Sequence, residues 1–175
     1  MHNAVSTSEM RVLMIDDDLS KPSATGCALR ALVKEIRYRR ILVVEAASAE
    51  EGRTAITAAP LPFCVLLAWT LSEADATHEE AKALIDLIKG KESRVPIFLM
   101  DKRGDAHSLT TDVMRDVDEV IWMLTDAPAF VAGRIVAAMR FIRKDVAPSL
   151  SRALVDFSVT RSRFSEDMLS PDRLR

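Results

Sequence analysis

Three consecutive carboxylates are the group of side chains in this sequence whose types and spacing best suit a metal ion. Asp16, Asp17 and Asp18 follow the apolar run RVLMI at 11–15. Such a run is typical of a buried strand, and carboxylates at the carboxyl end of a strand in an α/β protein are well placed for Mg²⁺. Because Mg²⁺ requires nearly octahedral oxygen coordination, Asp16 and Asp17 alone predict only a weak site. We favour the alternative, a solvated loop whose aspartates cap the following helix, and expect no functional metal site.

This acidic cluster resembles that of a phospho-receiver, but the receiver's other chemical groups are replaced. A receiver holds Mg²⁺ beside an aspartate at the end of its third strand, with a threonine or serine hydroxyl after the fourth strand and a lysine after the fifth. Here the acceptor position falls to Ala68 or Trp69, the hydroxyl position to Asp101 and the lysine position to Met123. Acceptor, hydroxyl and cation are lost together. We therefore expect a degenerate receiver whose fold is kept for its surface, because phosphoryl transfer depends on positioned charge around the phosphate.

The remaining polar candidates give weaker signals. His2, His78 and His107 are isolated, without acidic or cysteine partners at ligand spacing. The segment Lys102-Arg103-Gly104-Asp105 could touch a phosphate, although we favour a solvated loop. No glycine-rich phosphate loop and no nucleophile motif is present. We therefore expect no catalysis and no cofactor in this chain alone.

The positions of the cysteines and tryptophans predict structural roles in the protein core. Cys27 and Cys64 lie far apart without a C-x-x-C pattern, and we expect both to be small buried core thiols. Trp69 and Trp122 stand near the carboxyl ends of two predicted strands. Each could fill the vacated receiver pocket or anchor an interface, and the first reading is favoured.

Composition bounds the class of protein. The 175 residues are 49% hydrophobic and 29% charged with a formal net charge of −2, and the sequence pI is about 5.9. These values give no electrostatic argument for a nucleic-acid or anionic-membrane partner. No apolar run approaches the ~18–20 residues that span a bilayer. The start of the sequence, MHNAVSTSEM, does not resemble a signal peptide, so we expect a cytoplasmic protein.

Short apolar runs alternate with amphipathic stretches, which predicts an α/β, flavodoxin/CheY-like (βα)5 doubly wound parallel sheet. Continuous apolar runs indicate strands that are buried on both faces. Leu29 to Ile36 and Ala81 to Ile88 carry apolar residues at helical spacing, and Ser48 with Glu51 forms a capping-box pattern. The predicted strands are 11–15, 41–45, 63–68, 95–100 and 118–123.

The fifth helix is predicted over 127–144, with Pro128 in its first turn. It carries two apolar stripes, of which packing on one sheet face requires only one. The second stripe is therefore a candidate interface, unless a predicted linker helix at 149–158 covers it. The expected organisation is an N-terminal arm at 1–10, the receiver-like domain at 11–146, and the linker helix with a frayed tail at 147–175. The first stripe is Val131, Ile135, Ala138 and Ile142, and the second is Phe130, Ala137 and Phe141.

The segment VDEVIWMLTDAPAFVAGRIVAAMRF at 117–141 resembles the end of the N-terminal wing domain of PLP-dependent Orn/Lys/Arg decarboxylases, and most of all that of the acid-inducible, biodegradative arginine decarboxylases. VPIFLMDKR at 95–103 and APSLSRALVDFS at 147–158 resemble the same wing and its linker. In that family the wing is a pseudo-receiver that packs between catalytic dimers. The resemblance implies a non-catalytic domain that acts in oligomer assembly, with itself or a full-length decarboxylase as partner.

The family's catalytic motifs do not occur in this sequence. A P-G-H-x-G-G segment and an S-x-H-K lysine that holds PLP are both absent, and after Val159 the chain leaves the family's pattern. An engineered fragment, a truncated gene product and a natural stand-alone wing all remain open. The alternative function is a stand-alone pseudo-receiver that acts as a signalling adaptor or a decarboxylase regulator. A third alternative, an active receiver that uses Asp75 or Asp101, is opposed by the missing lysine and hydroxyl.

Overall fold

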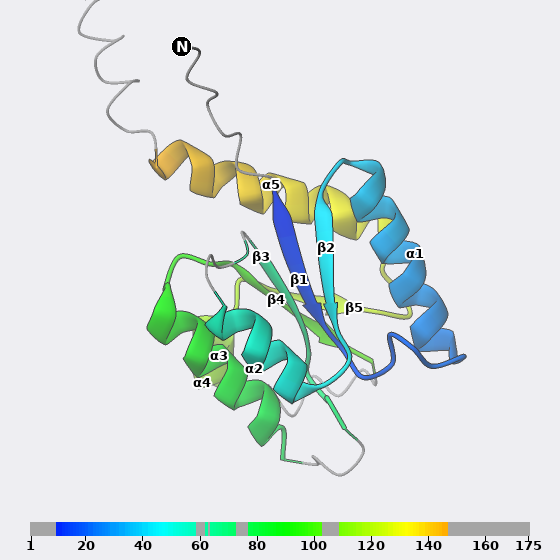
Figure 1. Cartoon of the computed structure of the whole chain (residues 1–175), viewed down its shortest axis with the longest axis horizontal. Helices are drawn as coiled ribbons and strands as arrows, with labels where there is room; N and C mark the ends of the chain where they lie inside the picture. The colour runs from blue at the N-terminus through cyan, green and yellow to red at the C-terminus, as the bar shows by residue number, and fades with distance from the viewer. Residues whose placement is uncertain (1–9, 59–61, 63, 73–76, 103–108, 147–175) are drawn as a thin grey trace, which may run out of the picture. The chain divides into compact units, whose positions relative to one another are not determined.

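A computed structural model describes residues 10–58, 62, 64–72, 77–102 and 109–146 of the chain, with side chains up to residue 140. Five parallel strands form one sheet in the order β2-β1-β3-β4-β5 (Figure 1). This is the flavodoxin/CheY-like arrangement predicted from the alternating pattern. The strands are β1 (Arg11–Ile15), β2 (Leu42–Ala46), β3 (Cys64–Ala68), β4 (Ile97–Asp101) and β5 (Glu119–Trp122). The helices are α1 (Ala24–Tyr38), α2 (Ala49–Thr57), α3 (Glu79–Lys91), α4 (Thr111–Asp116) and α5 (Pro128–Val146).

Helices cover both faces of the sheet, which explains why the inner strands are apolar throughout. Every residue of β3 and β4 is buried. One core cluster joins the sheet to α1 and α5, and the other joins it to α2, α3 and α4. Figure 1 shows α1 and α5 on one face and α2, α3 and α4 on the other. Alternate side chains of each strand therefore enter different cores, as the two-residue period of a strand requires.

Local signals set where the helices begin. The Ser23 hydroxyl accepts a hydrogen bond from the Gly26 amide, and the Ser48 hydroxyl accepts one from the Glu51 amide. The predicted reciprocal bond differs by one residue, because the Glu51 carboxylate accepts from the amide of Ala47 rather than of Ser48. The apolar residues of 81–88 are buried on α3 as predicted.

Several predictions lie outside the described residues: the arm at 1–9, the linker helix at 149–158 and the tail. The chain divides into a compact unit that runs to Met139 and a second unit that begins at Arg140, within α5. The domain boundary expected at 146/147 stays a prediction.

Over the ranges that the structure covers, no helix combines the length and the apolar character needed to cross a membrane.

Candidate functional site

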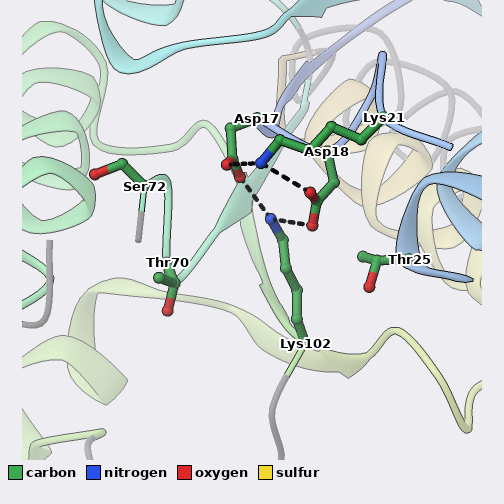
Figure 2. Close-up of a pocket in the computed structure, with 7 residues that line it drawn as sticks. All are labelled: Asp17, Asp18, Lys21, Thr25, Thr70, Ser72 and Lys102. Carbon is green, nitrogen blue, oxygen red and sulfur yellow. Dashed lines mark hydrogen bonds and ion pairs between the residues drawn. The ribbon is translucent and has the colours of Figure 1, made fainter. Parts of the chain in front are cut away.

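The site lies where β1, β3 and β4 end. Asp16, Asp17 and Asp18 follow β1, and Lys102 follows β4, so parallel pairing brings them to the same edge of the sheet. Asp17, Asp18 and Lys102 border a cavity of about 190 Å³ (Figure 2), and Asp16 is buried behind them. Hydroxyl groups complete its wall, and the lining residues are Asp17, Asp18, Lys21, Thr25, Thr70, Ser72 and Lys102.

Lys102 is the centre of this cluster. Its Nζ lies 2.6 Å from Oδ1 of Asp16, 2.7 Å from Oδ1 of Asp17 and 3.0 Å from Oδ2 of Asp18. The Lys102 side chain is only 10% exposed and extends toward the carboxylates in Figure 2. A charged side chain at this degree of burial is stable when it is paired and hydrogen-bonded, and here it has three carboxylate partners.

Burial and pairing act in opposite directions on the pKa values of the cluster. Burial raises the pKa of Asp16, and the nearby Lys102 ammonium offsets only part of that effect. Burial also raises the pKa of Asp18, but hydrogen bonds from Lys102 and Lys21 outweigh it and leave the pKa below its usual value. For Lys102 burial lowers the pKa, whereas the Asp16 carboxylate raises it, and attraction prevails. The cluster therefore favours a charged lysine.

Lys21 approaches the carboxylates from the solvent side. Its ammonium lies 2.6 Å from Oδ2 of Asp17 and 3.1 Å from Oδ1 of Asp18, and hydrogen bonds to these two aspartates raise its pKa. Nearly half of its side chain is exposed, so these pairs are weaker than those of Lys102. Three carboxylates and two ammonium groups leave the cluster one formal negative charge.

A close backbone approach fixes the acidic loop against α1. A Cβ atom at Gly26 would lie 2.2 Å from the carbonyl oxygen of Lys21 and 2.7 Å from that of Asp18. Glycine is therefore required for α1 to begin this close to the loop. The aspartates do not cap the helix, as one reading of the sequence proposed, because Ser23 is the N-cap.

The three degenerate receiver positions are all buried at the ends of their strands. Ala68 is the last residue of β3, Asp101 is the last of β4, and Met123 directly follows β5. Ala68 and Met123 have no carboxylate, hydroxyl or ammonium group that could act as the acceptor or the cation of a receiver. The cation that does reach it comes from Lys102, one strand away from the expected position.

The geometry of the cluster does not suit Mg²⁺, the ion considered above for a weak site at Asp16 and Asp17. The carboxylate oxygens do converge, and one atom from each aspartate lies within 4.8 Å of the others. However, these oxygens surround an ammonium at 2.6–3.0 Å, the spacing of charged hydrogen bonds and not the ~2.1 Å of Mg²⁺ coordination. A metal at this position would have to displace Lys102.

Lys102 is the functional residue that sequence reasoning missed. It was placed in a solvated loop that could touch phosphate, whereas the structure pairs it with carboxylates. The signal was available, because Lys102 follows β4 directly and the carboxyl ends of parallel strands share one edge. Arg103, Gly104, Asp105 and Asp75 lie outside the described residues.

Two further expectations need correction. Cys64 is buried, but Cys27 is exposed on α1, because it occupies a helix position turned away from the sheet. Trp69 is buried and belongs to the core cluster of α2 and α3, while Trp122 is only partly buried, and neither borders the cavity. Lys102, not a tryptophan, occupies the cavity's edge.

His78 has a packing role. Its ring stacks on Trp69 at 4.3 Å between centroids, and its Nδ1 lies 3.0 Å from the carbonyl oxygen of Trp69. The residue has a positive φ of 59° immediately before α3. His2 and His107 lie outside the described residues.

The sequence is similar to those of known basic amino-acid decarboxylases. The chain is 28% identical over 151 residues to the biodegradative arginine decarboxylase of Escherichia coli K12, an alignment that covers 85% of this chain and 20% of the relative. It is 22% identical to the lysine decarboxylase LdcA of Pseudomonas aeruginosa, over 83% of this chain and 20% of that protein. The chain therefore spans about a fifth of the length of these relatives.

Solved structures support the same fold. Lysine decarboxylase A from Pseudomonas aeruginosa matches with a TM-score of 0.69 at 21% identity, over 87% of this chain and 21% of that one. A CheY-like receiver domain protein from Methanospirillum hungatei JF-1 matches with a TM-score of 0.62 at 17% identity, over 79% of this chain and 99% of that one. The family model for the N-terminal domain of Orn/Lys/Arg decarboxylases matches residues 24–141. The chain therefore belongs to the family of N-terminal domains of Orn/Lys/Arg decarboxylases.

Proposed function

We propose that this chain is a non-catalytic wing domain that assembles with itself or with a basic amino-acid decarboxylase through the outer face of α5. The supporting observation is the unequal burial of that helix. Val131 and Ile135 are buried against the sheet and Ala138 is partly buried. On the second stripe Phe130 is 63% exposed and Ala137 is also exposed. The side chain of Phe141 lies outside the description.

The ring of Phe130 contacts a charged side chain of the same helix, Arg134. The Arg134 guanidinium lies 5.3 Å from the centroid of the Phe130 ring, in cation–π geometry. Arg134 in turn forms ion pairs with Glu119 at the start of β5 and with Asp126 before α5. Because Phe130 already contacts Arg134, its side chain should lose less conformational entropy on association than a side chain without such a contact. Aromatic and arginine side chains are also the residue types that most often anchor protein interfaces.

The test is the molar mass of the full chain in solution, alone and mixed with a cognate full-length decarboxylase, by size-exclusion chromatography with light scattering. We expect a self-assembly or a mixed complex, and Phe130→Asp should weaken it by at least tenfold, because the apolar ring is lost and a carboxylate must be desolvated in its place. Tyr38→Asp is the matched control, since Tyr38 is an 84% exposed aromatic residue on α1. A wild-type monomer at tens of micromolar that also ignores the decarboxylase would refute the proposal.

The same proposal requires that the chain lacks decarboxylase chemistry. The sequence has neither the S-x-H-K lysine motif nor the P-G-H-x-G-G segment. We expect no Schiff-base absorbance after addition of PLP, no single trapped site after borohydride reduction, and no CO₂ release from arginine, lysine or ornithine. Release above a buffer control would show that the chain is an enzyme.

A further inference from the structure

We propose that the Lys102 ammonium permanently replaces the divalent cation of a receiver, and that Asp16, Asp17 and Asp18 form a latent metal site which this lysine closes. The proposal starts from the mismatch between the cluster and Mg²⁺. It concerns what stabilises the strand ends and does not depend on the assembly function.

The stoichiometry of donors and acceptors favours a lysine. An ammonium has three N–H donors, and Lys102 has three carboxylates within 3.0 Å. Each donor can therefore take one aspartate. Asp16 already uses Oδ1 for Lys102 and for the amide of Asp18, which lies 2.9 Å away. The same atom thus ties the ammonium to the turn of the acidic loop.

A second observation is that the Asp16 carboxylate is buried and only partly hydrogen-bonded. Asp16 is 0% exposed, and its Oδ2 has no hydrogen-bond partner in the described part of the chain. A buried carboxylate is costly unless a positive charge compensates it. Lys102 supplies that charge, while one oxygen of Asp16 stays available as a ligand.

The position of Lys102 explains how the chain closes the site by itself. β3 lies between β1 and β4, so the side chain crosses the carboxyl end of β3, a span of two strand spacings or roughly 10 Å. Ala68 ends β3 at this place and is fully buried. A receiver would have its acceptor carboxylate there, and here the position holds an alanine. One covalently attached cation thereby links two strands that are not neighbours.

The experiment compares wild type with Lys102→Met, which keeps the length of the side chain and removes its charge. The probes are Mn²⁺ binding, followed by the electron paramagnetic resonance of free Mn²⁺, and thermal unfolding with and without about 10 mM Mg²⁺. Wild type should bind Mn²⁺ at least about tenfold more weakly than the variant, a difference of about 1.4 kcal/mol. Mg²⁺ should raise the Tm of Lys102→Met and leave that of wild type unchanged. KCl of matched ionic strength should not reproduce this effect.

Two further variants make the result decisive. Lys21→Met removes the exposed lysine and leaves Lys102 in the cluster, so it should gain no Mg²⁺ response. Asp16→Asn/Lys102→Met removes the buried carboxylate with its partner; it should fold even if Lys102→Met does not, and it should lose most of the Mn²⁺ affinity. Equal Mn²⁺ affinity in wild type and Lys102→Met would overturn the proposal. So would a Lys102→Met protein in which metal has no effect beyond that of salt, or a double variant that binds Mn²⁺ as tightly as Lys102→Met does.

Discussion

At the residue scale, the site shows how a lost cation position can be replaced from another strand. The expected lysine after β5 is Met123, which is buried in the core of α1 and α5. The positive charge comes instead from Lys102 after β4. Lys102 pairs with all three aspartates, so the acidic loop has a buried cation without the receiver's lysine. At this edge of the sheet, a lysine after β4 can therefore supply the positive charge that a receiver takes from a lysine after β5.

Alkaline pH should weaken the domain through Lys102. The raised pKa of Lys102 means that its stabilising contribution is complete below the ordinary lysine value of 10.5 and is lost as pH rises through the folded-state pKa. In acid the opposite shifts of Asp16 and Asp18 partly cancel, so the alkaline limb is the clearer test.

The measurement is urea unfolding of wild type and Lys102→Met across the alkaline range. The stability advantage of wild type should stay constant through neutral pH and shrink above about pH 10.5. An advantage that persists unchanged at high pH would contradict the charged pairing.

The two cysteines should differ in reactivity. Cys27 is exposed on α1, whereas Cys64 is 0% exposed in β3, and burial raises the pKa of its thiol. A thiol reagent should therefore modify one cysteine in the native protein and both after denaturation. Cys27→Ser should abolish the native reaction, and Cys64→Ser should leave it intact. Two rapid native reactions would indicate that β3 is accessible.

At the element scale, the strands and the longer helices were the elements that the sequence predicted best. All five strands were expected within two residues of their observed bounds, and the inner strands β1, β3 and β4 are the buried, continuous apolar runs that the sequence indicated. The stripe on α3 was read directly from its spacing. Helix α4 has only six residues, too few for a period to appear, and no range was predicted for it. Lys102 was missed because it was grouped with the loop residues that follow it and not with the end of β4, where parallel pairing places it beside the aspartates.

Alanine substitutions at Gly26 and Gly133 should have opposite effects on stability, because only Gly26 lies against other backbone atoms. In Gly26→Ala the new Cβ meets two backbone carbonyls of the acidic loop, so the loop or α1 must move. The expected loss is about 1–3 kcal/mol of unfolding free energy. Gly133 is exposed on α5, and nothing among the described residues lies within 4 Å of an added Cβ. Gly133→Ala should gain about 0.5–1 kcal/mol because glycine is a poor helix former. Denaturant unfolding of both variants checks the contrast, and equal effects would show that the Gly26 contact is not restrictive.

At the scale of the whole molecule, the fold of a signalling switch is retained while its input chemistry is replaced. The sheet order and helix layers follow the receiver pattern, and the lysine that occupies the acidic cluster is part of the chain itself. A domain whose cation is covalently attached has no ligand-dependent state at this site. If the chain assembles as proposed, a ligand at this site should not change that assembly.

The intact protein should not respond to a phosphoryl donor. Ala68 cannot accept a phosphoryl group, and Lys102 already holds the carboxylates that would bind Mg²⁺. After incubation with acetyl phosphate and Mg²⁺, intact mass should show no species heavier by about 80 Da, the mass of one phosphoryl group. Light scattering on the same sample should give an unchanged molar mass. A stoichiometric adduct would mean that another residue accepts phosphate, and an adduct with a changed molar mass would make the domain a switch rather than a fixed assembly element.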